Sequence, residues 1–244
     1  MNLTVDIGNS GTKIGLFNKN EPVQFLHFKP TASVPWKKMV AQYQINNAII
    51  CSVAKDSGKK IPKVLGTQIK TIYLSENTIV PISNNYKTPK TLGKDRLASA
   101  VGGNALFPKK NVLVIQAGTC ITFDMVNAKG QYLGGAISPG LMMRFKALHT
   151  FTGKLPLVTP ENINYRLGTT TQQSILSGVI NGMSDEIDSA IEDYRHKYKS
   201  LKVIITGGDA YFFESQLKNE IFAKPNLVLY GLNKILEYNV KSKG

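Results

Sequence analysis

The chain has 244 residues, of which 42% are hydrophobic and 19% are charged, a composition that is typical of globular proteins and excludes a disordered chain. Apolar stretches are interrupted by polar residues well short of bilayer-spanning length, so we expect no membrane segment. The net charge of +14 comes from lysines that are spread along the chain without interleaved aromatic residues, which disfavours nucleic-acid binding.

The first half of the sequence predicts alternating strands and helices. An apolar run at 3–7 ends in the glycine turn 8–11, and the strand pattern resumes at 13–17. Further strands are expected at 23–28 and 48–53, with a helix over 36–43 between them. The opening sequence MNLTVDIGNS lacks the features of a signal peptide, so we expect a cytoplasmic protein.

A helix is predicted from Asp95 to Phe107, with Pro108 just beyond its end. A second unit then repeats the opening of the chain: a strand at 112–115, the turn Ala117-Gly118-Thr119 and a returning strand at 121–126. Superposing Gly8 on Gly118 puts Asp6 on Gln116, which indicates an internal duplication. We therefore expect two similar domains, at 1–108 and 109–244.

The second half also contains a long amphipathic helix. Apolar residues recur at helical spacing from Ile175 to Tyr194, and the threonines at 169–171 are capping candidates. We interpret this stripe as a core face first and as an oligomer interface second. A strand at 203–205 and the turn Thr206-Gly207-Gly208-Asp209 then open another helix.

The two commonest nucleotide-binding motifs, GxxxxGK[ST] and GxGxxG, are absent from the sequence. Glycine turns at 8–11, 118–119 and 207–208 offer another way to bring backbone N–H groups against phosphate oxygens. Cys51 and Cys120 are expected to be reduced thiols. The three histidines lie far apart in the sequence, so a zinc site has little support and any metal is expected to arrive with a nucleotide.

An ordered set of motifs resembles the type III pantothenate kinases: DIGNSGTK at 6–13, GKDR at 93–96, AGTC at 117–120, GGAISPG at 134–140, TGKLP at 152–156, GTTTQQSILSG at 168–178 and TGG at 206–208. The resemblance implies an α/β fold of two ribonuclease-H-like, actin-like ATPase domains that face a central cleft. It also implies ATP-dependent phosphorylation of pantothenate with Mg²⁺, the first step of coenzyme A biosynthesis, by a homodimer.

The resemblance also implies roles for individual residues. ATP would be bound by Asp6, Ile7, Gly8, Asn9, Ser10, Gly11, Thr12, Lys13 and Thr119, and substrate by Tyr86, Gly93, Lys94, Asp95, Arg96 and Thr171. A carboxylate at Asp6 suits Mg²⁺ and its water, although an aspartate at a turn often bonds only to its own backbone. Asp95 suits a catalytic base, with a helix N-cap as the alternative. Arg96 suits a bidentate grip on a carboxylate, with a surface salt bridge as the alternative.

Gln116 departs from the family pattern, which has an aspartate at this position, associated with a monovalent cation such as K⁺ or NH₄⁺. The amide oxygen of Gln116 can coordinate a cation but lacks the charge that would attract it. Asp124, on the returning strand, is a further carboxylate whose direction the sequence does not fix. The departure leaves three readings open: a relaxed cation requirement, weaker binding, or a catalytically impaired nucleotide-binding or regulatory protein. A sugar or acetate kinase of the same superfamily is disfavoured by GKDR and by the short chain.

Overall fold

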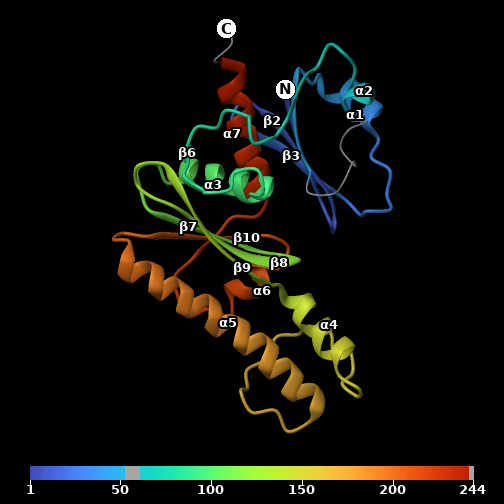
Figure 1. The fold of residues 1–244 in the computed structure, drawn as a ribbon. Helices are drawn as coiled ribbons and strands as arrows, with labels where there is room; N and C mark the ends of the chain where they lie inside the picture. The colour runs from blue at the N-terminus through green and yellow to red at the C-terminus, as the bar shows by residue number, and fades with distance from the viewer. Residues whose placement is uncertain (53–60, 242–244) are drawn as a thin grey trace. The chain divides into compact units, whose positions relative to one another are not determined.

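The computed structural model describes residues 1–52 and 61–241, which form two compact units (Figure 1). Unit 1 comprises Met1–Lys109, Ala128–Gly134 and Asn226–Gly244, and unit 2 comprises Lys110–Asn127 and Gly135–Pro225. These units are defined by contacts, whereas the predicted domains 1–108 and 109–244 were defined by a repeat. The domain bounds stay a prediction.

Unit 1 is built on a five-stranded sheet with the order β3-β2-β1-β4-β5. Its strands are β1 (Asn2–Gly8), β2 (Gly11–Asn18), β3 (Glu21–Phe28), β4 (Asn47–Ser52) and β5 (Lys70–Tyr73). The first three strands are antiparallel, and β4 pairs in parallel with both β1 and β5. The central strand β1 is buried along most of its length, as its apolar run predicted. The last residue of the strand expected at 48–53 lies outside the described residues.

The helices of unit 1 are α1 (Trp36–Tyr43), α2 (Ile61–Leu65), α3 (Lys94–Leu106) and α7 (Leu227–Lys241). The C-terminal helix α7 packs closely on α3, although the two are far apart in sequence. A side chain at Gly231 of α7 would place its Cβ 1.7 Å from the carbonyl oxygen of Ala98 in α3. This glycine therefore allows the two backbones to approach each other.

Unit 2 repeats the strand order of unit 1. Its sheet runs β9-β8-β7-β10-β11, with β7 antiparallel to β8 and parallel to β10, just as β1 is antiparallel to β2 and parallel to β4. The strands are β7 (Val112–Ala117), β8 (Cys120–Val126), β9 (Gln131–Pro139), β10 (Lys202–Thr206) and β11 (Phe222–Ala223). The shared order agrees with the internal duplication that the sequence indicated.

The first residues of β9 belong to unit 1, where they pair with the short strand β6 (Ser83–Asn84). Ser83 lies opposite Gln131 and Asn84 opposite Tyr132 in this parallel pair. The loop that carries Tyr86 is thereby attached to β9.

The helices of unit 2 are α4 (Leu141–Phe151), α5 (Thr171–Lys197) and α6 (Ala210–Glu214). The apolar stripe of α5 packs in the hydrophobic core beside the sheet, which confirms its interpretation as a core face; its buried members are Ile175, Val179, Met183, Ile187 and Ile191. Thr170 caps α5 by accepting a hydrogen bond from the backbone N–H of Gln173 at 3.2 Å. Among the helices of the described residues, none is both long and apolar enough to cross a bilayer.

Candidate functional site

Two carboxylates from distant parts of the sequence interact in unit 1. Asp6 lies near the end of β1, in register with Lys13 on β2 and with Cys51 on β4. The pKa of Asp6 is raised to about 7, first by burial and then by the negative charge of Asp95, against smaller lowering effects of Lys13 and of a hydrogen bond from the Cys51 thiol. The fold therefore places the first residue of DIGNSGTK within electrostatic reach of the aspartate of GKDR.

A divalent cation fits this arrangement. Two interacting carboxylates with partial burial are costly while both are ionised, and a hard cation with oxygen ligands would offset their charge. No cluster of three or more His, Cys, Asp or Glu side chains that could hold a metal occurs among the described residues. Asp6 and Asp95 would supply only part of the oxygen ligands of a hard cation, and phosphate oxygens and water usually complete the ligand shell of Mg²⁺ with a nucleotide.

Helix α3 presents Asp95 in its first turn. The N-cap of α3 is Gly93, without a side-chain capping bond, so Asp95 does not serve as the N-cap that the sequence left as its alternative role. A Cβ at Gly93 would lie 2.8 Å from Oδ1 of Asp95, so the glycine keeps space beside the carboxylate. A carboxylate at a helix N-terminus is also favoured by the helix dipole.

Arg96 and Tyr86 lie together in unit 1. Arg96 is only 5% exposed, which contradicts the alternative of a surface salt bridge. Its Cζ lies 6.0 Å from the centroid of the Tyr86 ring, within the range of a cation–π contact. Lys94 is turned toward Glu76, with 3.6 Å between Nζ and Oε2, and Nζ also donates to the carbonyl oxygen of Pro89.

The turn between β1 and β2 exposes Asn9 and Ser10. Gly11 has φ +140°, and a Cβ there would lie 2.3 Å from the carbonyl oxygen of Phe28. Glycine is therefore required for this tight turn. Ile7 is buried, so its side chain belongs to the core, while Thr12 lies opposite Ile7 in the ladder.

Unit 2 holds the corresponding turn at Gly118 and Thr119. The side chain of Thr119 is exposed, and its carbonyl oxygen accepts a hydrogen bond from the N–H of Gly140 at 3.2 Å. Gly207 has φ +103°, and a Cβ there would lie 2.0 Å from the carbonyl oxygen of Ala117. Two of the expected glycine turns thus meet within unit 2, because Gly207 packs against Ala117 and the N–H of Asp209 donates to the carbonyl oxygen of Ala117 at 3.1 Å.

Gln116 lies near the end of β7 and pairs with Thr122 on β8 and Thr206 on β10. Asp124 is fully buried and accepts a hydrogen bond from the Thr122 hydroxyl at 2.9 Å. Because residues two apart on a strand share a face, Gln116, Thr122 and Asp124 lie on one side of the sheet. The direction of Asp124, which the sequence left open, is therefore toward the face that carries Gln116.

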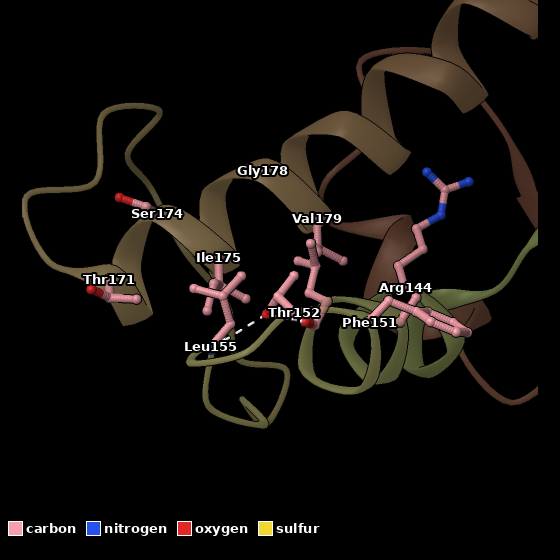
Figure 2. A pocket seen from close by; sticks show the side chains of 11 residues that line it. Arg144, Phe151, Thr152, Leu155, Thr171, Ser174, Ile175, Gly178 and Val179 are labelled. Carbon is pink, nitrogen blue, oxygen red and sulfur yellow. Dashed lines mark hydrogen bonds between the residues drawn. The ribbon is translucent and has the colours of Figure 1, made fainter.

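Thr171 lies at the start of α5, where it lines a pocket of about 760 Å³ between α4 and α5 (Figure 2). Most of the lining is apolar, including Phe151, Leu155 and Ile175, and Thr171 contributes a hydroxyl at one end. The pocket belongs to unit 2, whereas Asp6, Asp95, Arg96 and Tyr86 belong to unit 1.

Sequence reasoning missed Cys51 as a neighbour of the site. The sequence predicted only that Cys51 is a reduced thiol. Its position near the end of a predicted strand was a signal that its side chain could lie beside the residues at the end of β1. The thiol is fully buried and bonds to Asp6, and burial together with the charges of Asp6 and Asp95 raises the pKa of Cys51 well above its usual range. The thiol therefore remains a proton donor at neutral pH.

Comparisons with known proteins concern the chain as a whole. The family model described as type III pantothenate kinase matches residues 2–193. A type III pantothenate kinase from Phocaeicola vulgatus is 44% identical over 241 residues, covering 99% of this chain and 100% of the relative. One from Bacteroides fragilis is 42% identical over 239 residues, covering 98% of each chain.

A solved structure, component A of the (R)-2-hydroxyglutaryl-CoA dehydratase from Acidaminococcus fermentans, superposes with a TM-score of 0.56 at 13% identity and covers 100% of this chain and 99% of that one. At this identity the likeness shows the fold alone, and it confirms the predicted α/β class of two ribonuclease-H-like domains. The family assignment rests on the match of the family model and on the sequence identity to these relatives over nearly the full length of the chain. The chain belongs to the type III pantothenate kinase family.

Proposed function

We propose that this protein transfers the γ-phosphate of ATP to the primary hydroxyl of pantothenate, giving 4'-phosphopantothenate in the first step of coenzyme A biosynthesis. The observation that carries the proposal is the juxtaposition in unit 1 of two interacting carboxylates, Asp6 and Asp95, with the buried guanidinium of Arg96 next to Asp95 in sequence. Phosphoryl transfer to an alcohol needs a base, a site for the phosphate-bound cation and a group that orients the acceptor.

Asp95 is assigned as the base that accepts the proton of the attacking hydroxyl. Its place in the first turn of α3, with the space left by Gly93, supports access to an acceptor group. Arg96 is assigned to the pantothenate carboxylate, because its planar fork matches two acceptor oxygens. Tyr86, Gly93, Lys94 and Thr171 are assigned to the same substrate.

Asp6 is assigned to the cation of Mg·ATP. When bound, Mg²⁺ supplies positive charge that neutralises the transferring phosphates. The turn from Ile7 to Lys13 is assigned to the phosphates, since Asn9 and Ser10 are exposed in a tight turn and Lys13 adds a positive charge. Thr119 is assigned to ATP through its exposed hydroxyl. Gln116 is assigned to a monovalent-cation position in which K⁺ or NH₄⁺ binds weakly.

A homodimer in the cytoplasm completes the proposal. The open apolar pocket beside Thr171 and the exposed Phe151 support association through unit 2. The remaining positive charge is assigned to attraction of the anionic substrates and not to nucleic acid.

The test is an assay of pantothenate-dependent ADP formation from Mg·ATP, with Asp95→Asn beside the wild-type protein. We expect turnover by the wild type and a loss of about 10²–10⁴-fold in kcat for the variant, the range typical of a general base. The melting temperature should stay close to that of the wild type, because Asp95 does not cap α3. A folded wild-type protein that binds ATP without pantothenate-dependent turnover would refute the kinase and support a regulatory nucleotide-binding protein.

A further inference from the structure

The ring of Tyr86 connects Arg96 to the first residues of β9. The centroids of the Tyr86 and Tyr132 rings lie 6.1 Å apart with an angle of 40° between their planes. The centroid of the Tyr86 ring also lies 6.0 Å from Cζ of Arg96. Tyr132 is fully buried, so packing fixes its ring and restricts where Tyr86 can lie.

Backbone hydrogen bonds attach the same loop to β9. The N–H of Ser83 donates to the carbonyl oxygen of Gly130 at 2.9 Å, and the N–H of Asn85 donates to that of Tyr132 at 3.0 Å. The side chain of Asn84 accepts from the N–H of Tyr86 at 3.1 Å. Tyr86 is therefore held through its backbone as well as through its ring.

Gly134 lies directly beside the Tyr86 ring. A Cβ at Gly134 would lie 3.3 Å from Cδ2 and 3.4 Å from Cε2 of Tyr86, closer than ordinary van der Waals contact. The residue also has φ +101°, a conformation that favours glycine. A side chain at this position would push the ring of Tyr86 and so disturb its contact with Arg96.

We propose that Tyr132 and Gly134 are positioning residues, which hold Tyr86 against the guanidinium of Arg96 and so set the preference of the site for an acidic substrate. The inference rests on the proposed function and deepens it, because it adds two residues outside the assigned substrate site. It also gives the first glycine of GGAISPG a role: close approach of the strand to the Tyr86 ring.

The substitution Gly134→Ala tests the inference, and Gly130→Ala is its matched control. Gly130 lies shortly before β9, also has a positive φ of +70°, and a Cβ there would meet nothing closer than 3.8 Å. Both variants carry backbone strain, but only the first pushes Tyr86. The readouts are KM for pantothenate, KM for Mg·ATP and the inhibition constant of pantothenol, in which an alcohol replaces the carboxylate.

We expect Gly134→Ala to raise KM for pantothenate about tenfold, as loss of a desolvated cation–π arrangement would, without raising the inhibition constant of pantothenol in proportion. KM for Mg·ATP should not change. Gly130→Ala keeps the backbone carbonyl that accepts from the N–H of Ser83, so it should leave all three constants near the wild-type values. Equal effects of the two glycine variants, or equal losses for pantothenate and pantothenol, would overturn the inference.

Tyr132→Leu beside Tyr132→Phe repeats the test through the other neighbour of Tyr86, because Phe keeps the ring and Leu removes it. Melting temperatures establish which variants are folded. Arg96→Lys separates the inference from the proposed function. If the wild type shows no pantothenate-dependent turnover, or Arg96→Lys leaves the preference for pantothenate unchanged, the proposed function or the role of Arg96 is wrong. If Arg96→Lys lowers the preference but neither Gly134→Ala nor Tyr132→Leu does, the inference alone is wrong.

Discussion

The carboxyl group of Asp6 makes the stability of unit 1 depend on pH. Its pKa is raised from 3.8 to about 7, first by burial and then by the charge of Asp95, so the folded state binds this proton more tightly than the unfolded state. The stabilising contribution is complete below the unfolded pKa and is lost as pH rises through the folded pKa. The free energy of unfolding should therefore fall between about pH 4 and pH 7, on the order of 4 kcal/mol from this group.

Urea unfolding at a series of pH values without Mg²⁺ or nucleotide checks this prediction, with Asp6→Asn as the comparison. The variant should lose this part of the pH dependence, because an amide does not titrate. Parallel stability curves for the two proteins would contradict it. Mg·ATP should bind more tightly to the wild type as pH rises toward 7, since ionised Asp6 is the form that attracts the cation.

Gln116 can be tested by introducing the carboxylate that the resemblance to the family leads us to expect at this position. Gln116→Asp adds a carboxylate beside Thr122 and Thr206, on the sheet face that also carries Asp124. We expect this variant to raise the ratio of activity in K⁺ to activity in Na⁺ several-fold, because a full charge attracts a cation better than an amide oxygen does.

Gln116→Asn is the matched control, since asparagine has the shape of aspartate without its charge. K⁺-dependent shifts in melting temperature give a second readout that does not depend on turnover. The same salt response from the Asp and Asn variants would show that charge at position 116 does not govern cation binding.

The individual residues of the site were partly predictable from sequence. Asp6 lies near the end of a predicted strand and Asp95 at the start of a predicted helix, and each has a glycine two positions away. This local pattern is typical of residues in a binding site. Their interaction was not predictable, because 89 positions separate them and the sheet register that aligns Asp6 with Cys51 depends on tertiary pairing. The burial of Arg96 is likewise a consequence of packing around α3 and not of local sequence.

At the scale of elements, strands with strong apolar runs and the long helix α5 were predicted, whereas β9 and α7 were not. The glycine-rich part of β9 reads as a turn, yet a Cβ at Gly135 would lie 1.5 Å from the carbonyl oxygen of Phe123, so the glycine permits close approach of neighbouring strands. Helix α7 buries Asn233 and Asn239 among its apolar residues, which obscures its periodicity.

The contact between α7 and α3 predicts opposite effects of one substitution at two helical glycines. Gly231→Ala would place a methyl group 1.7 Å from the carbonyl oxygen of Ala98, so the helices must separate and the protein should lose about 1–3 kcal/mol of stability. Gly182→Ala in α5 meets nothing within 4 Å, so helix propensity should stabilise the protein by about 0.5–1 kcal/mol.

Chemical unfolding of the two variants measures both effects. Because α3 carries Asp95 in its first turn, Gly231→Ala should also lower kcat under conditions in which it is folded. Equal stability changes at the two positions would show that the close approach of α7 to α3 does not limit side-chain size.

At the scale of the whole molecule, the repeated strand order explains why one chain of this length forms two compact units. Each unit closes a sheet of the same topology, and the chain returns at its C-terminus to cover α3 of unit 1. The repeat of the glycine turn in the sequence was enough to predict a second sheet. The packing of α7 on α3 could not be predicted from the sequence, because it depends on the tertiary structure.

Apolar surface on unit 2 predicts that the protein is a homodimer. Phe151 is 86% exposed at the rim of the pocket between α4 and α5, and Leu167 is 83% exposed before α5. Large apolar side chains with this much exposure are costly in water, and apolar surface of this kind often marks an interaction site. Light scattering after size-exclusion chromatography should give twice the chain mass of 26.8 kDa.

Phe151→Asp should shift the protein toward monomer, because a charge placed in an apolar interface must be desolvated without a partner. Tyr211→Asp is the matched control, since Tyr211 is an exposed aromatic residue on α6 of the same unit, at 64% exposure, and does not line the pocket. If association also orders Thr171 for substrate, Phe151→Asp should raise KM for pantothenate and the effect should decrease as protein concentration rises. If the wild-type protein has the mass of a single chain, or if both variants dissociate to the same extent, the apolar surface of unit 2 does not form a dimer interface.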